Sequence, residues 1–413
     1  MNAIVVGGGI AGLSAALYLQ ESGWEVTVLE RGDFSDNCSY GNAGYVCPSH
    51  FVPLATPGIV RQGLKWMWNA RSPFYVEPRL SWSLLRWGWR FMRVATPGHV
   101  RQSARPLLDI GLLSQACYEN WRNIPGFDFA YEKKGLMEYF QTPEKEAHSH
   151  HMAEEALKLG LEAELLAATQ VQAMEPQTRV NVKGALYFKG DAHLYPAKLM
   201  TGLQHVLRQR GVVLKPHSTV TSFDLKGGRV HTVRAGDHTY NADVVVLAAG
   251  AWSRELAAAL AHPLLLVPGR GYSVTYQDAP FHLNYPAVLQ EGRVAITPMD
   301  GNKIRFGGTM EITSTQTPVR LKRVEGILQA VQRYLPDFRV PAPAPDQVWY
   351  GYRPCSADGL PYIGKIRDNV IVATGHAMVG LSLGAGTGKL VAEIAGGQPA
   401  SMDIRPFNPF RFS

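Results

Sequence analysis

Three glycines near the N-terminus have the spacing of a turn that brings the peptide backbone against phosphate groups. Residues 7–12 read Gly-Gly-Gly-Ile-Ala-Gly and contain the pattern Gly-x-Gly-x-x-Gly. In such a turn the first glycine permits a tight bend, the second lets a diphosphate approach, and the third lets a helix pack against a strand. Glu30, at the end of the next apolar run, can accept hydrogen bonds from ribose hydroxyls. The spacing predicts a dinucleotide site that includes Gly7, Gly9, Ile10, Ala11, Gly12 and Glu30.

The segments around this turn have the patterns of a strand, a helix and a second strand. Residues 3–6 are an apolar run typical of a buried parallel strand. Residues 13–22 are rich in Ala and Leu and are ended by Gly23, and residues 25–29 form a second apolar run. A lone glycine pattern is often a chance loop, but this order is that of the βαβ unit that binds dinucleotides.

Two later segments predict further strands of the same sheet. Residues 243–253 and 369–376 are apolar runs that end in small residues, and residues 380–393 follow as a glycine-rich helix start whose N–H groups can face an electron-rich ring. This last segment is not a P-loop, because Leu383 and Leu390 stand where that motif has Gly and Ser or Thr. Since no second strand-linked glycine motif occurs in mid-chain, we expect electrons to come from the substrate and not from a nicotinamide cofactor.

Several short motifs are spread over nearly the whole chain, and they are specific only when taken together. They are residues 39–44 (Ser-Tyr-Gly-Asn-Ala-Gly), 270–273 (Arg-Gly-Tyr-Ser), 305–311 (Arg-Phe-Gly-Gly-Thr-Met-Glu), 351–354 (Gly-Tyr-Arg-Pro), 358–364 (Asp-Gly-Leu-Pro-Tyr-Ile-Gly) and 374–376 (Thr-Gly-His). With them the sequence resembles the D-amino-acid oxidase superfamily of FAD-dependent amine oxidoreductases, and within it the bacterial D-amino-acid dehydrogenases of the small-subunit type.

The resemblance implies three candidate catalytic residues. Arg353 occupies the place of the arginine that holds the substrate carboxylate beside the flavin, and a guanidinium suits this task because its planar fork binds a carboxylate through two parallel hydrogen bonds. Tyr272 either hydrogen-bonds the substrate or packs in a sheet; both alternatives stay open. His376, expected at the pyrimidine side of the flavin, completes the set.

The resemblance also implies a set of FAD contacts beyond the glycine turn and Glu30. They comprise Arg31, Ser39, Asn42, Ala43, Gly44, Val220, Ala249, Gly250, Trp252, Gly351, Gly375, Gly380, Leu381 and Ser382. Relatives with a covalent flavin carry a cysteine that aligns near Gly351. Cys355 is offset from that place, so we expect noncovalent FAD.

The expected fold class is α/β: a Rossmann-like FAD-binding domain of the glutathione-reductase type, with an α+β substrate domain on an antiparallel sheet. We assign residues 1–50, 190–255 and 350–413 to FAD binding. Residues 51–189 and 256–349 are assigned to the substrate domain. Hairpin signals in that second part cover residues 272–276, 293–297 and 304–308.

The expected reaction is transfer of a hydride from an amine-bearing carbon to flavin N5, which gives an imino acid that water converts to a keto acid and ammonia. This scheme requires no catalytic base in the protein. Three alternatives stay open: a dehydrogenase of a small, D-configured amino acid that passes electrons to a quinone or other carrier; an oxidase or dehydrogenase of a secondary amine such as D-hydroxyproline, or of sarcosine or glycine; and an FAD-binding subunit of a larger complex.

Composition and charge narrow the class of protein. The 413 residues are 46% hydrophobic and 18% charged, a balance typical of a globular chain. The net charge of +7 favours anionic partners such as carboxylates, a diphosphate or anionic lipid, and nucleic acid is not expected. No apolar run is long enough to span a bilayer, and the four cysteines have no metal-ligand spacing. We expect a cytoplasmic protein, with peripheral contact to the inner face of the membrane as an alternative.

One stretch alternates tryptophan with basic residues. Residues 61–93 hold Trp66, Trp68, Trp82, Trp87 and Trp89 together with Arg61, Lys65, Arg71, Arg79, Arg86, Arg90 and Arg93. Such a composition suits a lipid headgroup interface. The favoured alternative is that the tryptophans fill a core while the arginines face water.

A histidine cluster and a single aspartate are interpreted as structural features and not as functional sites. His148, His150 and His151 suggest a metal site, but they lie among glutamates in what resembles a solvated helix. Asp358, which precedes a glycine, is interpreted as a turn residue and not as a catalytic acid. We therefore expect no metal.

Overall fold

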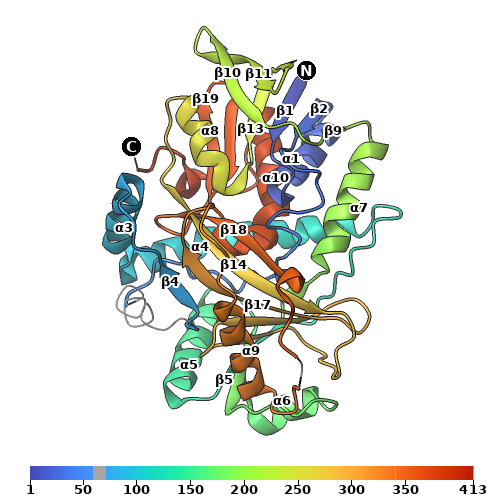
Figure 1. Ribbon diagram of the computed structural model, residues 1–413, viewed down its shortest axis with the longest axis vertical. Helices are drawn as coiled ribbons and strands as arrows, with labels where there is room; N and C mark the ends of the chain where they lie inside the picture. Colours follow the sequence, from blue (N-terminus) through green and yellow to red (C-terminus); the bar gives the residue numbers. More distant parts are fainter. Residues whose placement is uncertain (59–70, 340, 413) are drawn as a thin grey trace.

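The first layer of the molecule is a parallel sheet at the top of Figure 1. The computed structural model describes residues 1–58, 71–339 and 341–412. Within them six strands follow the order β19-β20-β13-β1-β2-β9. Their bounds are β1 Asn2–Val6, β2 Glu25–Leu29, β9 Val213–Lys215, β13 Val244–Leu247, β19 Tyr362–Arg367 and β20 Val370–Thr374. Only β19, at one edge, runs antiparallel to its neighbour. The strands predicted for the dinucleotide fold are therefore confirmed.

Both faces of this sheet are covered, which explains why its central strands are continuous apolar runs. Ala3 and Val5 of β1 belong to a core shared with helices, whereas Ile4 and Val6 point into a second core on the other face. The helices of the first core are α1 Ile10–Glu21, α4 Pro97–Trp121, α7 Pro196–Gln209 and α10 Gly380–Ala395. The second core is closed by β10 Val220–Lys226, β11 Arg229–Ala235, β12 His238–Asn241 and α8 Ser253–Ala259.

A larger mixed sheet lies in the lower half of Figure 1. Its main path is β18-β14-β17-β16-β15-β5-β7-β6, and β4 pairs with β17 beside it. The bounds are β4 Phe74–Val76, β5 Leu136–Phe140, β6 Ala163–Ala167, β7 Gly184–Phe188, β14 Leu266–Tyr276, β15 Ala287–Leu289, β16 Val294–Pro298, β17 Ile304–Ile312 and β18 Val348–Ser356. Most neighbours are antiparallel, and β15–β5 and β17–β4 are parallel.

The remaining elements cover this second sheet or join the two layers. Helix α9 packs its apolar face on the core of the sheet. The bounds are α3 Trp82–Val94, α5 Pro143–Lys158, α6 Ala168–Met174, α9 Lys322–Tyr334, the β3–β8 pair Tyr45–Val46 and Ala192–His193, and the short 3-10 turns Gly250–Trp252, Pro345–Gln347, Ala377–Val379 and Arg405–Phe407.

The expected domain boundaries differ from the observed layers in two places. Helix α4 lies inside the range 51–189, yet its Tyr118 and Trp121 are part of the same core as β1, and the Tyr118 hydroxyl donates to the Leu381 carbonyl at 2.6 Å. Strand β18 begins before residue 350 and pairs with β14 along its whole length, so it is an edge strand of the second sheet. Packing between segments distant in the sequence decides to which layer α4 and β18 belong, and composition does not predict such packing.

Candidate cofactor and substrate cavity

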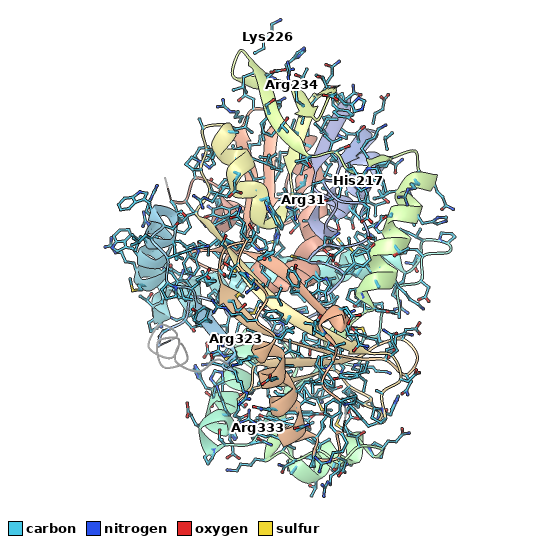
Figure 2. The ribbon with its side chains drawn as sticks, viewed as in Figure 1. Arg31, His217, Lys226, Arg234, Arg323 and Arg333 are labelled. Carbon is cyan, nitrogen blue, oxygen red and sulfur yellow. The ribbon has the colours of Figure 1, made fainter. Side chains whose placement is uncertain are left out.

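A cavity of about 1590 Å³ lies between the two sheets. The glycine turn, the loop after β2, the start of β10 and the start of α10 line one part of it, and β14, β17 and β18 line the other. Arg31 and His217, both labelled in Figure 2, line the nucleotide part. The cavity therefore joins the expected dinucleotide site to the expected substrate site.

The glycine turn has the geometry that the sequence pattern predicts. Gly7 has φ +112°, and a Cβ there would lie 2.5 Å from the carbonyl oxygen of Ala248. A Cβ on Gly12 would lie 1.9 Å from the Gly7 oxygen. At Gly9 the only neighbour of such an atom would be Ser39 Oγ at 3.7 Å, and Gly9 lines the cavity. Gly7 and Gly12 are thus required by the fold, while Gly9 keeps the backbone open for a diphosphate, so this turn fits FAD.

The acidic residue at the end of β2 is held in place by backbone donors. Glu30 Oε2 accepts from the Gly8 N–H at 2.6 Å, and its Oε1 accepts from the Gly32 N–H at 2.9 Å. The carboxylate edges the cavity with further lone pairs available to ribose hydroxyls. Beside it, Ser39 Oγ accepts from the Ile10 N–H at 3.0 Å, which fixes the loop on the start of α1.

Several of the expected FAD contacts lie at the same end of the cavity. The Arg31 guanidinium lies over the Trp252 ring at 3.4 Å, a stacked pair that walls the cavity. Val220, Ala249 and Gly250 line the cavity next to it. All five residues therefore line the same end of the cavity.

The loop that contains Asn42 is clamped from the second sheet. Asn42 Oδ1 accepts from the Gly44 N–H at 2.9 Å, and Asn42 and Ala43 line the cavity. Buried Arg305 donates from Nη1 to the carbonyls of Tyr40 and Asn42 at 2.7 and 2.6 Å. Burial lowers the pKa of Arg305 to about 10. Sequence reasoning missed this clamp, although an arginine inside an apolar strand was a usable signal.

Arg353 presents a partly buried guanidinium to the cavity. Its Nη1 donates to the Thr309 carbonyl at 2.6 Å. The group lies flat on Gly271, where a Cβ would be only 2.0 Å from Nη2. Among the described residues no carboxylate lies within 4 Å of it, and desolvation lowers its pKa. A partly desolvated cation without an ion-pair partner is expected to bind an anion there.

The Tyr272 hydroxyl is hydrogen-bonded to other groups of the protein. It donates to Glu311 Oε2 at 2.7 Å and accepts from the Arg320 N–H at 3.1 Å. Glu311 is also paired with fully buried Arg270 at 2.8 Å. These bonds favour the packing alternative for Tyr272, whose ring nevertheless lines the cavity.

His376 is a buried, neutral group at the wall of the cavity. Its Nε2 lies 2.9 Å from Thr387 Oγ1, and burial lowers its pKa to about 4. Gly380, Leu381 and Ser382 line the cavity beside it at the start of α10.

Three glycines predicted as cofactor contacts lie behind the wall and not on it. Gly12, Gly44 and Gly375 are not among the lining residues. Gly44 and Gly375 have φ of +87° each, and a Cβ on Gly44 would lie 2.2 Å from the Leu194 carbonyl. They shape the backbone that carries the contact residues.

Cys355 lies off the cavity, in agreement with its offset from the attachment position near Gly351, and Cys38 lines the cavity. Buried Cys355 points to Met310 Sδ at 3.9 Å and does not line the cavity. Cys38 does, with its thiol donating to the Tyr352 carbonyl at 3.0 Å, and a Cβ on Gly351 would lie 3.0 Å from its sulfur. Burial raises the pKa of Cys38 to about 11, so it is a thiol and a poor nucleophile. Noncovalent flavin stays a prediction.

The remaining candidates divide into turn, surface and core residues. Asp358 is the turn residue expected: its Oδ1 accepts from the Leu360 N–H at 3.2 Å and the carboxylate pairs with Arg411 at 2.7 Å. The three histidines lie on α5, and the described part of the chain contains no group of His, Cys, Asp or Glu arranged to hold a metal. Nor does any described helix have the length and apolarity to cross a bilayer.

The tryptophan stretch is only partly a core. Trp66 and Trp68, with Arg61 and Lys65, lie outside the described residues. Trp87 is buried and its Nε1 donates to the Cys355 carbonyl at 3.0 Å. Trp82 and Trp89 are exposed, so the core interpretation is wrong for these two.

A glycine turn opening on a cavity between a parallel sheet and a mixed sheet defines a dinucleotide-binding protein of two layers. The family model described as FAD dependent oxidoreductase matches residues 2–394, and the chain belongs to that family. It is therefore an FAD-dependent oxidoreductase.

Relatives match over nearly full length. The chain is 32% identical over 410 residues to a D-amino acid dehydrogenase of Neisseria meningitidis serogroup C, covering 96% of each, and 29% identical over 415 residues to one of Granulibacter bethesdensis, covering 98% of this chain and 97% of the other. Among solved structures, glycine oxidase from Geobacillus kaustophilus has a TM-score of 0.79 at 24% identity, with 100% of this chain and 98% of the other covered. L-proline dehydrogenase from P. horikoshii has 0.74 at 18% identity, with 100% and 97% covered. These likenesses establish the two-layer fold.

Proposed function

We propose that this enzyme oxidises a small amino acid, of D configuration, at its amine-bearing carbon and passes the electrons to a quinone or another carrier. The observation that carries the proposal is the partly buried Arg353 guanidinium, which faces the cavity and has no carboxylate partner among the described residues. The names of the curated relatives, D-amino acid dehydrogenases at about 30% identity, support the substrate class.

Binding of the carboxylate is the first task of the protein. Arg353 is oriented before substrate arrives, because Gly271 leaves room for its plane and the Thr309 carbonyl holds Nη1. The remaining N–H groups of the fork are free to bind two carboxylate oxygens. Orientation of this kind decides which C–H bond of the substrate faces the reacting partner.

The reaction then needs little more from the side chains than orientation and exclusion of water. FAD, when bound, supplies the two-electron acceptor for the hydride that leaves the substrate carbon. The amine must enter this step with its lone pair free, and the product imino acid takes up water after release to give a keto acid and ammonia. Neutral His376 and the engaged Tyr272 hydroxyl add no charge to the site. We assign them to shaping the wall and not to proton transfer.

The test is a substrate panel with purified holoenzyme, with anaerobic bleaching of the flavin absorbance as readout. We expect D-amino acids with small side chains to reduce the flavin faster than their L enantiomers, and faster than sarcosine, glycine or D-hydroxyproline. A preference for a secondary amine would replace the proposed substrate. Absence of bleaching with every amine, while size-exclusion chromatography shows a well-folded yellow protein, would support the FAD-binding subunit instead.

The electron acceptor is tested in the same preparation. Turnover with an artificial dye or a water-soluble quinone should exceed turnover with oxygen, and stoichiometric peroxide at a comparable rate would identify an oxidase. Since quinones reside in membranes, we also propose that the enzyme works in the cytoplasm at the inner face of the membrane, as a peripheral protein.

A further inference from the structure

Helix α3 carries an apolar face that no described residue covers. Its outward side chains are large and well exposed: Trp82 at 75%, Leu85 at 58%, Trp89 at 49% and Met92 at 56%. Positions 82, 85, 89 and 92 recur every three or four residues, so they form a single stripe along the helix. Leu80, just before the helix, is fully exposed as well. A contiguous exposed stripe of this kind marks a contact surface.

The opposite side of α3 is firmly attached to the protein. Trp87 and Phe91 are buried and stacked with ring centroids 4.9 Å apart, and they belong to a core with Val267 and Met310 of the second sheet. The helix is therefore apolar on two sides, and only the inner side is needed to hold it in place. Within the described residues, the exposed stripe holds no other element in place.

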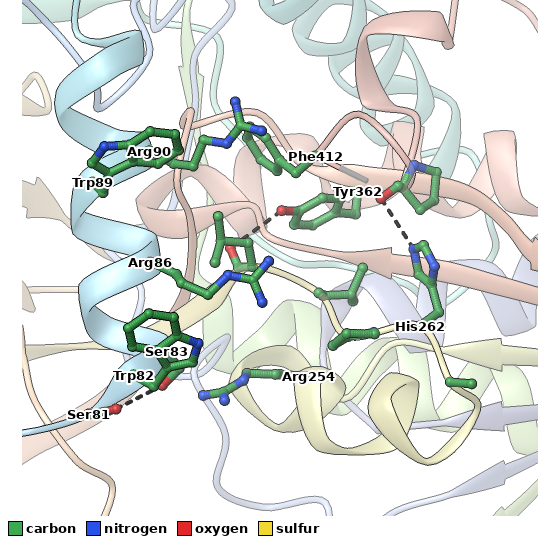
Figure 3. Close-up of a pocket in the computed structure, with 15 residues that line it drawn as sticks. Ser81, Trp82, Ser83, Arg86, Trp89, Arg90, Arg254, His262, Tyr362 and Phe412 are labelled. Atoms are coloured by element: carbon green, nitrogen blue, oxygen red, sulfur yellow. Dashed lines mark hydrogen bonds between the residues drawn. The ribbon is translucent and has the colours of Figure 1, made fainter.

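A basic cavity of about 670 Å³ opens beside the stripe. It lies between α3, the segment 261–265 that follows α8, and the C-terminal residues 409–412. Figure 3 shows Arg86 from α3 and Arg254 from α8 extending into this space, with Arg90 beside Phe412. The Arg90 guanidinium lies 5.5 Å from the Phe412 ring.

The charge in this cavity is uncompensated. The lining residues include three arginines, Arg86, Arg90 and Arg254, and no Asp or Glu. None of the three is within 4 Å of a carboxylate in the described parts of the chain. By contrast, nearby Arg411 is neutralised by Asp358. Guanidinium groups bind phosphate through two parallel hydrogen bonds.

We infer that this cavity binds the phosphate of an anionic phospholipid headgroup while the α3 stripe enters the outer layer of the same leaflet. Basic residues at the headgroup level flanked by Trp, Leu and Met below it are the arrangement of helices that lie in a membrane interface. The inference rests on the proposed function, in which the electron acceptor is a membrane quinone. It adds the face of the molecule that docks and the lipid class that this face selects.

The experiment is sedimentation of the holoenzyme with vesicles of phosphatidylcholine, either pure or containing phosphatidylglycerol. We expect binding to the anionic vesicles that falls as salt rises, and little binding to the neutral ones. The pocket variant Arg86→Gln/Arg254→Gln should bind anionic vesicles at least about tenfold more weakly than the native enzyme. The stripe variant Trp82→Ser/Trp89→Ser should lose binding to a similar degree.

A matched control removes two positive charges elsewhere. Arg333 and Arg339 are exposed, and Arg333 lies at the lower end of the molecule, away from α3 (Figure 2). Arg333→Gln/Arg339→Gln should bind vesicles like the native enzyme. If this control lost as much vesicle binding as the pocket variant, net charge alone would drive binding. That result would overturn the inference that the cavity binds a lipid phosphate.

Two other outcomes would also overturn the inference. One is equal binding of native enzyme to neutral and anionic vesicles. The other is a concentration-dependent dimer that the stripe variant abolishes, without vesicle binding by the native enzyme, which would assign the stripe to a second copy of the chain. Dye reduction by a D-amino acid in solution is measured for each variant and should stay unchanged. Its absence in the native enzyme would contradict the proposed function, whatever the vesicle result.

Discussion

The two ends of the large cavity are built in opposite ways. At the nucleotide end, one continuous stretch from β1 to Glu30 supplies the turn, the helix start and the acidic residue, and the geometry depends on backbone space at glycines. At the arginine end, Arg353 crosses Gly271 on one neighbouring strand to reach Thr309 on the next. The first end is local in sequence and steric; the second is non-local and electrostatic. Substitutions at the two ends should therefore fail differently.

The largest effect on folding stability is expected where a side chain would meet backbone. Gly12→Ala places a methyl group 1.9 Å from the Gly7 oxygen, and backbone cannot move aside cheaply. We expect a loss of about 3 kcal/mol of folding free energy, measured by urea unfolding of the apoprotein. Gly9→Ala is the matched variant: its methyl group meets only Ser39 Oγ at 3.7 Å, so it should keep the apoprotein stable and weaken FAD. Similar stabilities for the two variants would refute this division of roles.

At the arginine end a methyl group should disturb function and spare the fold. Gly271→Ala meets the Arg353 guanidinium, the far end of a flexible side chain, at 2.0 Å and should push it aside. We expect kcat/KM for the amino acid to fall between about tenfold and about a hundredfold with FAD content unchanged. In the Arg353→Ala background the same change should cost nothing further, because the displaced group is gone. Full additivity would show that Gly271 acts through something else.

Substitutions of Glu30 test whether its carboxylate contributes to FAD binding at the nucleotide end. Glu30→Ala should weaken FAD binding by about 1 to 3 kcal/mol, through lost ribose hydrogen bonds and the freed Gly8 and Gly32 donors. Glu30→Gln keeps one acceptor oxygen and should lose less. Fluorescence titration of apoprotein with FAD measures both, and unchanged affinity in Glu30→Ala would remove this residue from the site.

The smallest effect concerns the pH dependence of stability. The pKa of His376 is lowered to about 4 in the folded protein, against an ordinary value of 6.5. Its neutral form therefore stabilises the fold fully above pH 6.5, and this contribution is lost as the pH falls towards 4. Between pH 8 and pH 5.5 the loss is about 1.4 kcal/mol for this group. The acid-side decline in urea unfolding should be smaller in His376→Gln. Identical declines would mean that His376 titrates normally.

The two ends of the cavity also differ in how far the sequence could predict them. The glycine turn, Glu30 and the strands around them follow from a contiguous pattern, so their positions were predictable. The pairing of β18 with β14 depends on strands distant in the chain, and only the structure reveals that Gly271 lies beneath Arg353. Family resemblance pointed to Arg353. An arginine inside an apolar strand was a local signal for the Arg305 clamp, whereas the engaged Tyr272 hydroxyl has no local signature.

The burial of the tryptophans on α3 was the least predictable feature from the sequence. Trp82, Trp87 and Trp89 have the same residue type and nearly the same sequence context, yet one is buried and two are exposed. Helical periodicity assigns them to different faces of α3, but which face meets the protein depends on the sheet beneath it.

The central claim is that Arg353 binds the substrate carboxylate, and stopped-flow flavin reduction tests it most directly. Native enzyme and Arg353→Ala are each mixed anaerobically with a D-amino acid and with the corresponding amine that lacks the carboxylate. We predict that the variant keeps its flavin and loses about 2 to 5 kcal/mol in kcat/KM for the amino acid, with partial recovery in Arg353→Lys. The amine should be a poor substrate for the native enzyme and should change little in the variant. An equal loss for both substrates would show that Arg353 supports the fold or the flavin and does not anchor a carboxylate.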